Sequence, residues 1–438
     1  MAELKRIVGK TYIGLLVCLL VFNMLILVSD KTDDLQVTYA YIEMLNTAEG
    51  VKSDSKLSTE AATIAWQEYF QKYEINGSDS SDKTAAAKQA REKLMQQAKY
   101  IDNYKGIIED KRQTAILYAT AGTYKKNSFE YNNLLKTQYD LSQIIDADVQ
   151  LSNGLWLEKL YKNNYIHLLT LITCVYTVYM FFSERKNGLY HIVHTGQSGR
   201  GVLFVKRSII LLIQAVVTNV ALYTESAVML LNRYDGVKDL NVAAVSDEYF
   251  ILTSGKLSRI QFLGLIILLS ILANVVLSLV LWAILLCFGN VNIGLFFYCC
   301  ICVADVVIYK VISAKSILQI FKYLNVYYLF FPNKAAEYFN WGCFNIAVSL
   351  LTTTIIVSVF IGILALFASA YISIRKYFTG KMNIVENAIE LILTYIMRLM
   401  VKTNNFGKEV YKILISQGII WILLLLAYIA ANVEPSYG

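Results

Sequence analysis

Residues 183–207, SERKNGLYHIVHTGQSGRGVLFVKR, lie between two long apolar segments and are too polar to cross a bilayer. They carry five basic side chains and one acid, Glu184. Because short loops rich in Lys and Arg stay in the cytoplasm, the sequence predicts that this loop is cytoplasmic. Leu189 and Ile192 belong to a short apolar stripe, and glycines from Gly196 onward end the predicted helix. Such an amphipathic element can lie passively in the membrane interface, or it can dock on a cytosolic partner.

The composition excludes a soluble protein. The chain has 438 residues, of which 56% are hydrophobic and 17% are charged. These values indicate several membrane spans together with one polar region. The net charge of +7 is modest, and the basic residues cluster beside apolar segments, where they report topology. We therefore expect membrane lipid, and no nucleic acid, as a partner.

Six apolar segments predict six membrane-spanning helices. They cover residues 11–28, 167–182, 202–222, 261–288, 293–309 and 344–372. A further apolar run at 418–431 predicts a seventh span, and the approach to it, Glu409–Leu414, repeats the approach to the first span, Glu3–Val8. The fold class that follows is an all-α membrane protein with a cytoplasmic N-terminus.

The polar region between the first and second spans is predicted to be an extracellular helical domain. Helical patterns cover 58–73, 84–100, 107–119 and 128–149, with turn signals at 76–81 and at Lys105-Gly106. Two interpretations remain open for this domain, a folded cap and a surface that contacts substrate or partner.

The predicted divisions of the chain follow from these segments. They are a first transmembrane helix at 1–29, the extracellular domain at 30–163, a transmembrane core at 164–378 with the loop 183–207, a cytoplasmic amphipathic helix at 379–412, and the seventh span at 413–438. The aromatic residues of 310–342 predict a segment at the membrane interface. One observation disagrees with a topology in which successive loops alternate between the two sides of the membrane. The loops 232–260 and 310–342 are predicted to be outside, yet they contain several basic residues.

The order of residues in the loop resembles the cytoplasmic loop of ABC-2 type transport permeases. The matching residues are Glu184-Arg185-Lys186-Asn187-Gly188-Leu189, Thr195-Gly196, Gly199-Arg200 and Lys206. A second stretch, Lys322-Tyr323-Leu324-Asn325 followed by Pro332, resembles the aromatic segment before the last span of such permeases in Gram-positive bacteria. The similarity covers roughly residues 1–30 and 160–378.

The resemblance implies a six-helix ABC-2 transmembrane domain, like that of type V exporters, with the helical domain inserted between its first two helices. In that family the loop is a coupling helix that contacts a cytosolic ATP-binding cassette subunit. Glu184, Gly188, Leu189, Ile192 and Arg200 are then the expected coupling residues. A second permease subunit, identical or different, is implied as well.

Two functions from different classes follow from the resemblance. The first is ATP-driven export of an amphipathic substrate, such as an antimicrobial peptide or a lipid-like compound, in the manner of relatives that serve peptide export, immunity or resistance. The second is a mechanical or signalling role, in which ATP hydrolysis moves the extracellular domain. The chain contains no phosphate-binding loop, so ATP and Mg²⁺ would bind the partner subunit. No set of acid, base and nucleophile indicates an enzyme.

Two acids within apolar segments are candidates for a translocation route, Asp305 in the fifth span and Glu225 at the end of the third. Ionisable residues at membrane depth usually face a bundle interior, a cavity or a partner charge. A purely structural role, in which Asp305 pairs with Lys310 or a neighbouring hydroxyl, is the alternative. His191 and His194 have a spacing that could bind metal, but no carboxylate or cysteine is near, so no metal site is predicted.

Overall fold

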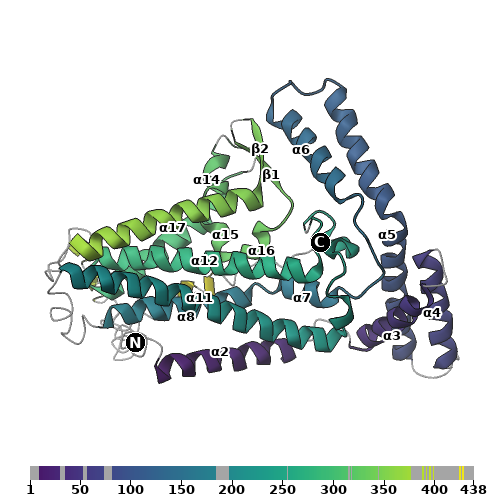
Figure 1. The fold of residues 1–438 in the computed structure, drawn as a ribbon, viewed down its shortest axis with the longest axis horizontal. Coiled ribbons are helices and arrows are strands. Elements are labelled where there is room, and N and C mark those ends of the chain that lie inside the picture. The colour runs from purple at the N-terminus through teal and green to yellow at the C-terminus, as the bar shows by residue number, and fades with distance from the viewer. Residues whose placement is uncertain are drawn as a thin grey trace.

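The computed structural model describes residues 9–29, 35–52, 57–73, 81–183, 197–253, 255–313, 316, 318–343 and 345–375, and scattered positions between 387 and 428. The molecule is elongated, with long helices lying side by side and a smaller group of helices, α3 to α6, at one end (Figure 1). The structure is that of an all-α membrane protein, with one short hairpin of two strands.

Among the described residues, five helices are long and apolar enough to cross a membrane. They are α2 (Lys10–Ser29), α11 (Gln197–Tyr234), α12 (Arg259–Cys287), α13 (Val291–Val311) and α17 (Leu350–Arg375). A sixth span forms if α7 (Leu155–Lys162) and α8 (Tyr165–Phe181) are taken together, although the chain bends by 48° between them. All six spans predicted from the apolar segments therefore correspond to helices, while the seventh lies almost wholly outside the described residues.

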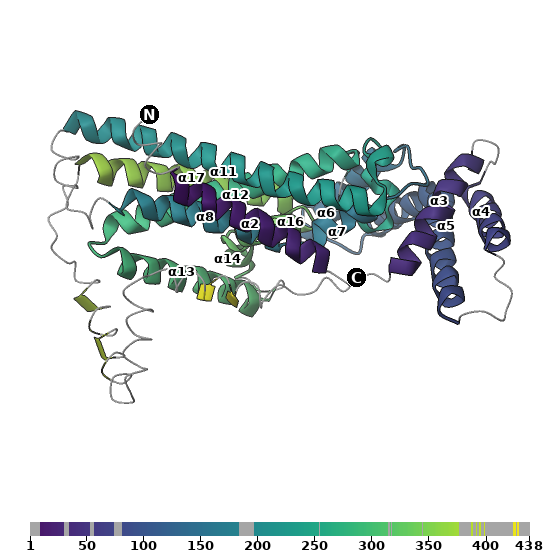
Figure 2. The same cartoon turned by 90° about the horizontal axis from the view of Figure 1, so that it is seen from below.

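Helix α12 forms the centre of the bundle and packs against α8, α11 and α17. Its Trp282 is 1% exposed and stacks on Phe204 of α11, with 5.0 Å between ring centroids. Phe181 of α8 lies against the same indole ring at 5.2 Å. Figure 2 shows α11 and α17 on one side of this layer and α13 on the other.

The helical domain consists of α3 (Leu35–Lys52), α4 (Ser58–Lys72), α5 (Ser81–Thr120) and α6 (Phe129–Ile144). Small side chains allow its helices to approach closely, since alanines of α4 and α5 are buried in its core: Ala61, Ala62, Ala65, Ala86, Ala87 and Ala90. The Tyr104 hydroxyl donates to the Ile144 carbonyl at 2.9 Å and ties α5 to α6.

The domain core also includes part of the loop that precedes α12. Val245 is fully buried in it, and its carbonyl accepts a hydrogen bond from Tyr100 at 2.7 Å. The domain is thus built from two separate parts of the sequence, whereas the sequence predicted one continuous insertion.

The structure differs from the sequence prediction at two elements. Helix α3 was not predicted, and the predicted turn at Lys105-Gly106 is wrong, because α5 continues through both residues as one helix of 40 residues. The aromatic segment 319–335 is largely buried within the protein. It forms three short helices, α14 (Gln319–Tyr323), α15 (Tyr327–Phe330) and α16 (Pro332–Ala335), which pack into the bundle core.

The strands β1 (Asn340–Cys343) and β2 (Ile346–Ser349) follow α16 and pair in an antiparallel hairpin. The last described span therefore begins at Leu350, later than the predicted start at 344.

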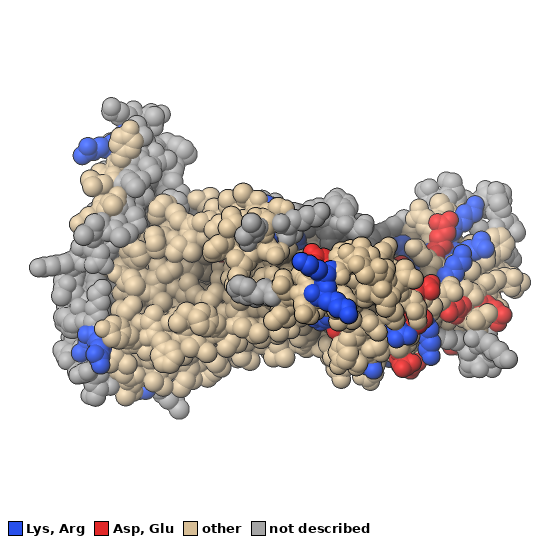
Figure 3. Space-filling view, turned by 90° about the horizontal axis from the view of Figure 1, so that it is seen from above, with Lys and Arg blue, Asp and Glu red and all other residues tan. Residues whose placement is uncertain are grey.

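Charged side chains are distributed unevenly over the surface (Figure 3). On the face shown, they gather over the helical domain and at the ends of the bundle, and the surface between is free of described charges. A lipid-facing band requires this distribution, because charged groups are costly in the hydrocarbon core.

Candidate functional site

Polar side chains from three membrane helices meet inside the bundle, with His167 of α8 at the centre. His167 is 1% exposed. Its Nε2 lies 2.8 Å from the carbonyl oxygen of Leu329, and its Nδ1 lies 2.8 Å from the Ser270 hydroxyl of α12. Since a carbonyl oxygen can only accept, Nε2 carries a hydrogen and donates it. The aromatic segment is thereby fixed to α8.

The hydrogen bonds continue from Ser270 to the facing helices. The Ser270 hydroxyl lies 2.6 Å from Asn219 Oδ1 of α11. Asn274 Nδ2 donates to Thr170 Oγ1 at 2.6 Å and to Asn219 Oδ1 at 3.2 Å. The Ser270 hydroxyl has a single hydrogen, so it donates either to Asn219 or to the neighbouring histidine. Donation to Nδ1 of His167 is the arrangement consistent with a neutral ring whose hydrogen lies on Nε2, because Nδ1 can then only accept.

A second group of hydrogen bonds lies next to the first. Gln214 Nε2 of α11 donates to Thr173 Oγ1 of α8 at 2.7 Å, and Thr218 lies within 3.4 Å of both side chains. Gln214 Oε1 and Asn274 Oδ1 are buried and accept no hydrogen bond within the described part of the chain. These two oxygens are the sites at which the network is incomplete.

Helical spacing explains why these residues meet. On α8 the polar residues recur three apart at His167, Thr170 and Thr173, and on α12 they recur four apart at Ser270 and Asn274. Residues three or four apart share one helix face. In an apolar environment such faces turn toward each other, because lipid offers polar groups no hydrogen bonds. This spacing was a signal present in the sequence, although the sequence analysis did not identify the cluster.

The cluster is closed, since none of its eight side chains is more than 4% exposed: His167, Thr170, Thr173, Gln214, Thr218, Asn219, Ser270 and Asn274. Such an arrangement can hold α8, α11 and α12 in one register. Within the described residues, no group of three or more His, Cys, Asp or Glu is arranged to hold a metal ion.

The predicted coupling residues fall mostly outside the part of the chain that the structure describes. Glu184, Gly188, Leu189 and Ile192 belong to that stretch. Arg200 is described, and it lies partly buried in the first turn of α11. The coupling role of these residues and their contacts therefore remain predictions.

The two predicted route acids lie in different places. Glu225 of α11 accepts a hydrogen bond from Asn23 of α2 at 2.8 Å, and Asn23 is fully buried. Asp305 of α13 accepts a hydrogen bond from the backbone amide of Val326, directly before α15. Because α11 and α13 lie on opposite sides of the bundle, the structure does not bring these acids together (Figure 2).

A buried arginine joins the helical domain to the bundle. Arg259, the first residue of α12, is fully buried and contacts Asp247 through two nitrogens, at 3.1 Å and 3.0 Å. It also donates to the Asp239 carbonyl at 3.3 Å and to the Ser152 hydroxyl at 2.9 Å. Burial raises the pKa of Asp247, while the guanidinium opposes that shift. Arg259 therefore holds together the loop before α12, at the end of the domain, and the chain before α7.

Comparison with known proteins gives no relative. No family model, no curated protein and no solved structure matches the chain. The argument about function consequently depends on the residues and geometry described above.

Proposed function

We propose that this chain is the membrane subunit of an ATP-binding cassette transporter that exports an amphipathic substrate, such as an antimicrobial peptide or a lipid-like compound. A separate cytosolic subunit would bind ATP and Mg²⁺ and contact the loop 183–207. A second permease subunit, identical or different, would complete the assembly. Support comes from the five or six apolar helices and from the basic loop between two of them.

The observation that carries the proposal is the continuity of α11. Its 38 residues span about 57 Å at a rise of about 1.5 Å per residue, nearly twice the hydrocarbon thickness of about 30 Å. The helix includes residues 197–207 of the predicted loop, with Arg200, Lys206 and Arg207, and the glycines Gly199 and Gly201 do not interrupt it. It ends at Tyr234, whose carbonyl accepts a hydrogen bond from Asn153 at the domain junction. A displacement at the loop would therefore be transmitted along one helix to the opposite end of the bundle.

The same continuity favours a second candidate function, a mechanical or signalling role without transport. In this case ATP hydrolysis on the partner would move the helical domain through α11 and the Arg259 junction. The closed polar cluster is compatible with it, because no described polar side chain of the cluster is open to a route.

One experiment separates the two candidates. The chain and its ATPase are reconstituted in liposomes, and export of a fluorescent amphipathic peptide is measured alongside the distance between spin labels at Ser142 of α6 and at Ser349 near α17. The transport proposal predicts ATP-dependent flux of the peptide. Domain movement on ATP addition without flux of peptide or labelled lipid would favour the mechanical role.

A further inference from the structure

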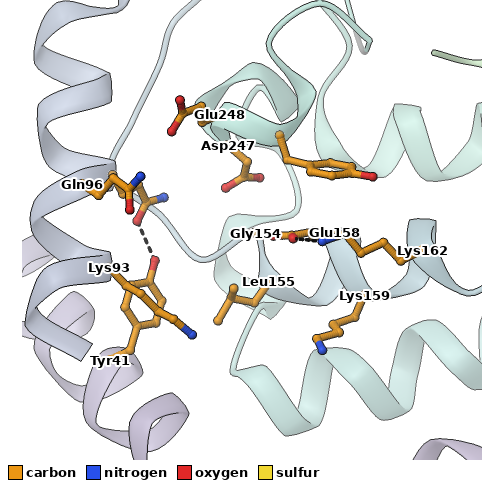
Figure 4. Close-up of a pocket in the computed structure, with 12 residues that line it drawn as sticks. Tyr41, Lys93, Gln96, Gly154, Leu155, Glu158, Lys159, Lys162, Asp247 and Glu248 are labelled. Carbon is orange, nitrogen blue, oxygen red and sulfur yellow. Dashed lines mark hydrogen bonds and ion pairs between the residues drawn. The ribbon is translucent and has the colours of Figure 1, made fainter. Parts of the chain in front are cut away.

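A cavity of about 480 Å³ lies where the helical domain meets the bundle (Figure 4). Its walls come from α3, α5, α7 and the loop at 247–249. Tyr41 of α3 forms part of the wall and donates to Gln97 of α5 at 2.6 Å. The volume is within the range of small-molecule sites.

The charges of the cavity are separated into two sides. Lys93 of α5 and Lys159 of α7 extend to one side, and Asp247 and Glu248 lie on the other (Figure 4). Leu155 lies on the side of the lysines, between Lys93 and Lys159, in this view (Figure 4). The cavity thus has lysine side chains at one end and acidic side chains at the other.

Three of the lining charges already have ion-pair partners. Lys162 pairs with Glu158 at 2.5 Å, and its ammonium also lies 4.7 Å from the centre of the Tyr249 ring. Asp247 is held by Arg259, as described above. Glu248 is therefore the carboxylate best placed to meet a ligand cation, and Lys93 is an exposed ammonium that can meet a ligand anion.

The cavity lies beside α7, which together with α8 forms the sixth candidate span. Helix α7 buries Leu157 and Leu160 in the bundle core and carries its lysines on the other side. Tyr249 of the cavity wall lies against Tyr161, with 5.8 Å between the ring centroids. A ligand of the cavity would therefore lie at the end of this candidate span.

We propose that this cavity binds a zwitterionic head group that carries both a phosphate and an amine, as in phosphatidylethanolamine. The phosphate would lie between Lys93 and Lys159, and the amine would face Glu248. A purely anionic head group would meet the carboxylates of the far side, and a purely cationic ligand would meet the lysines. This inference does not depend on the proposed transport function.

Native mass spectrometry of the full chain, released from membranes of mixed phosphatidylethanolamine and phosphatidylglycerol, tests the proposal. The wild type is expected to retain phosphatidylethanolamine preferentially. The double variant Lys93→Glu and Lys159→Glu is expected to retain about tenfold less, while Lys88→Glu, an exposed change on the same helix outside the cavity, retains the wild-type amount. Equal retention of the two lipids by the wild type, or full retention by the double variant, would overturn the proposal.

A variant with a reversed lipid preference would give a result that misfolding of the protein cannot produce. Glu248→Lys replaces the carboxylate by a third ammonium, so the variant should now prefer phosphatidylglycerol; a preference left unchanged counts against the assigned orientation. Competition with soluble glycerophosphoethanolamine identifies the source of the head group. Displacement only at a large excess over lipid supports a membrane lipid, and displacement at equal concentration supports a free phosphate-amine compound of the same chemistry.

Discussion

Arg259 is a single residue on which the attachment of the helical domain depends. Its guanidinium is fully buried against Asp247 and Asp239, so its removal leaves two acids without their cation. Breaking a buried ion pair from one side costs about 3–5 kcal/mol.

We therefore expect Arg259→Met to lower the free energy of unfolding by about 3–5 kcal/mol. Lys256→Met removes an exposed charge from the same loop and should change stability by less than about 0.5 kcal/mol. Denaturant titration of both variants in detergent provides the comparison. Equal stabilities would show that the buried arginine does not hold the junction.

The polar cluster allows a second prediction at the same scale. Asn274→Leu removes the hydrogen bonds to Thr170 and Asn219 and should destabilise the bundle by about 1–2 kcal/mol. Leu268→Ala, a 65% exposed position on the same helix, is the matched control and should have little effect. Unfolding in mixed micelles measures both; a greater loss for the control would contradict the described network.

The partly buried carboxyl group of Glu49 in α3 is expected to make the stability of the protein depend on pH. Burial raises its pKa from 4.5 to about 7, and the negative charge of Asp239 adds to this shift. A folded pKa above the unfolded pKa means that the folded state binds the proton more tightly. Its stabilising contribution is therefore complete below about pH 4.5 and is lost as the pH rises through about 7.

Glu49→Gln should remove this dependence and make the protein more stable than the wild type at pH 8, without a gain at pH 4. Thermal unfolding of the two proteins across this range measures the difference. If the variant loses as much stability between pH 5 and 8 as the wild type does, the assignment to Glu49 is wrong.

At the scale of elements, α5 shows how local signals can mislead. Lys105-Gly106 is a turn signal in isolation, yet the helix continues, because Tyr104 and Ile108 on either side are fully buried in the domain core. Tertiary packing thus outweighs the low helix propensity of one glycine, which is only about 1 kcal/mol.

The continuous helix makes Gly106→Ala a stabilising change of about 0.5–1 kcal/mol, because a Cβ at Gly106 meets no atom within 4 Å and alanine favours the helix. Gly154→Ala is the opposite case, since its Cβ would lie 1.8 Å from Asp247, and it should destabilise. The unfolding temperatures of the two variants measure the difference. Destabilisation by Gly106→Ala would contradict the continuous helix at this position.

Apolar segments were sufficient to predict the six spans, because length and hydropathy decide whether a helix can cross a membrane. The packing of the aromatic segment could not be predicted from the sequence. Phe330 and Phe331 are fully buried, and the Leu329 carbonyl of α15 accepts a hydrogen bond from His167, 162 residues away. The polar cluster and the Arg259 junction likewise join distant residues, and only the packed structure brings them together.

At the scale of the whole molecule, α11 connects the two ends. Its first turns include residues 197–207 of the basic loop, its middle contributes Asn219 to the closed polar cluster, and its last residue, Tyr234, contacts the domain junction. Each of these places would respond to a shift of the same helix. This arrangement is what a subunit driven from one side of the membrane requires.

The most direct test of the account measures Mg²⁺-dependent ATP hydrolysis that co-purifies with the chain from its own membranes. The account predicts such activity with the wild type and with Tyr139→Asp, a control at a 64% exposed position of α6. It predicts loss of both the partner and the activity for Leu189→Asp with Ile192→Asp, at unchanged chain level and thermal stability, because the new charges would oppose docking by several kcal/mol. ATP hydrolysis that is absent from the wild type, or that remains with the double variant, would contradict the central claim.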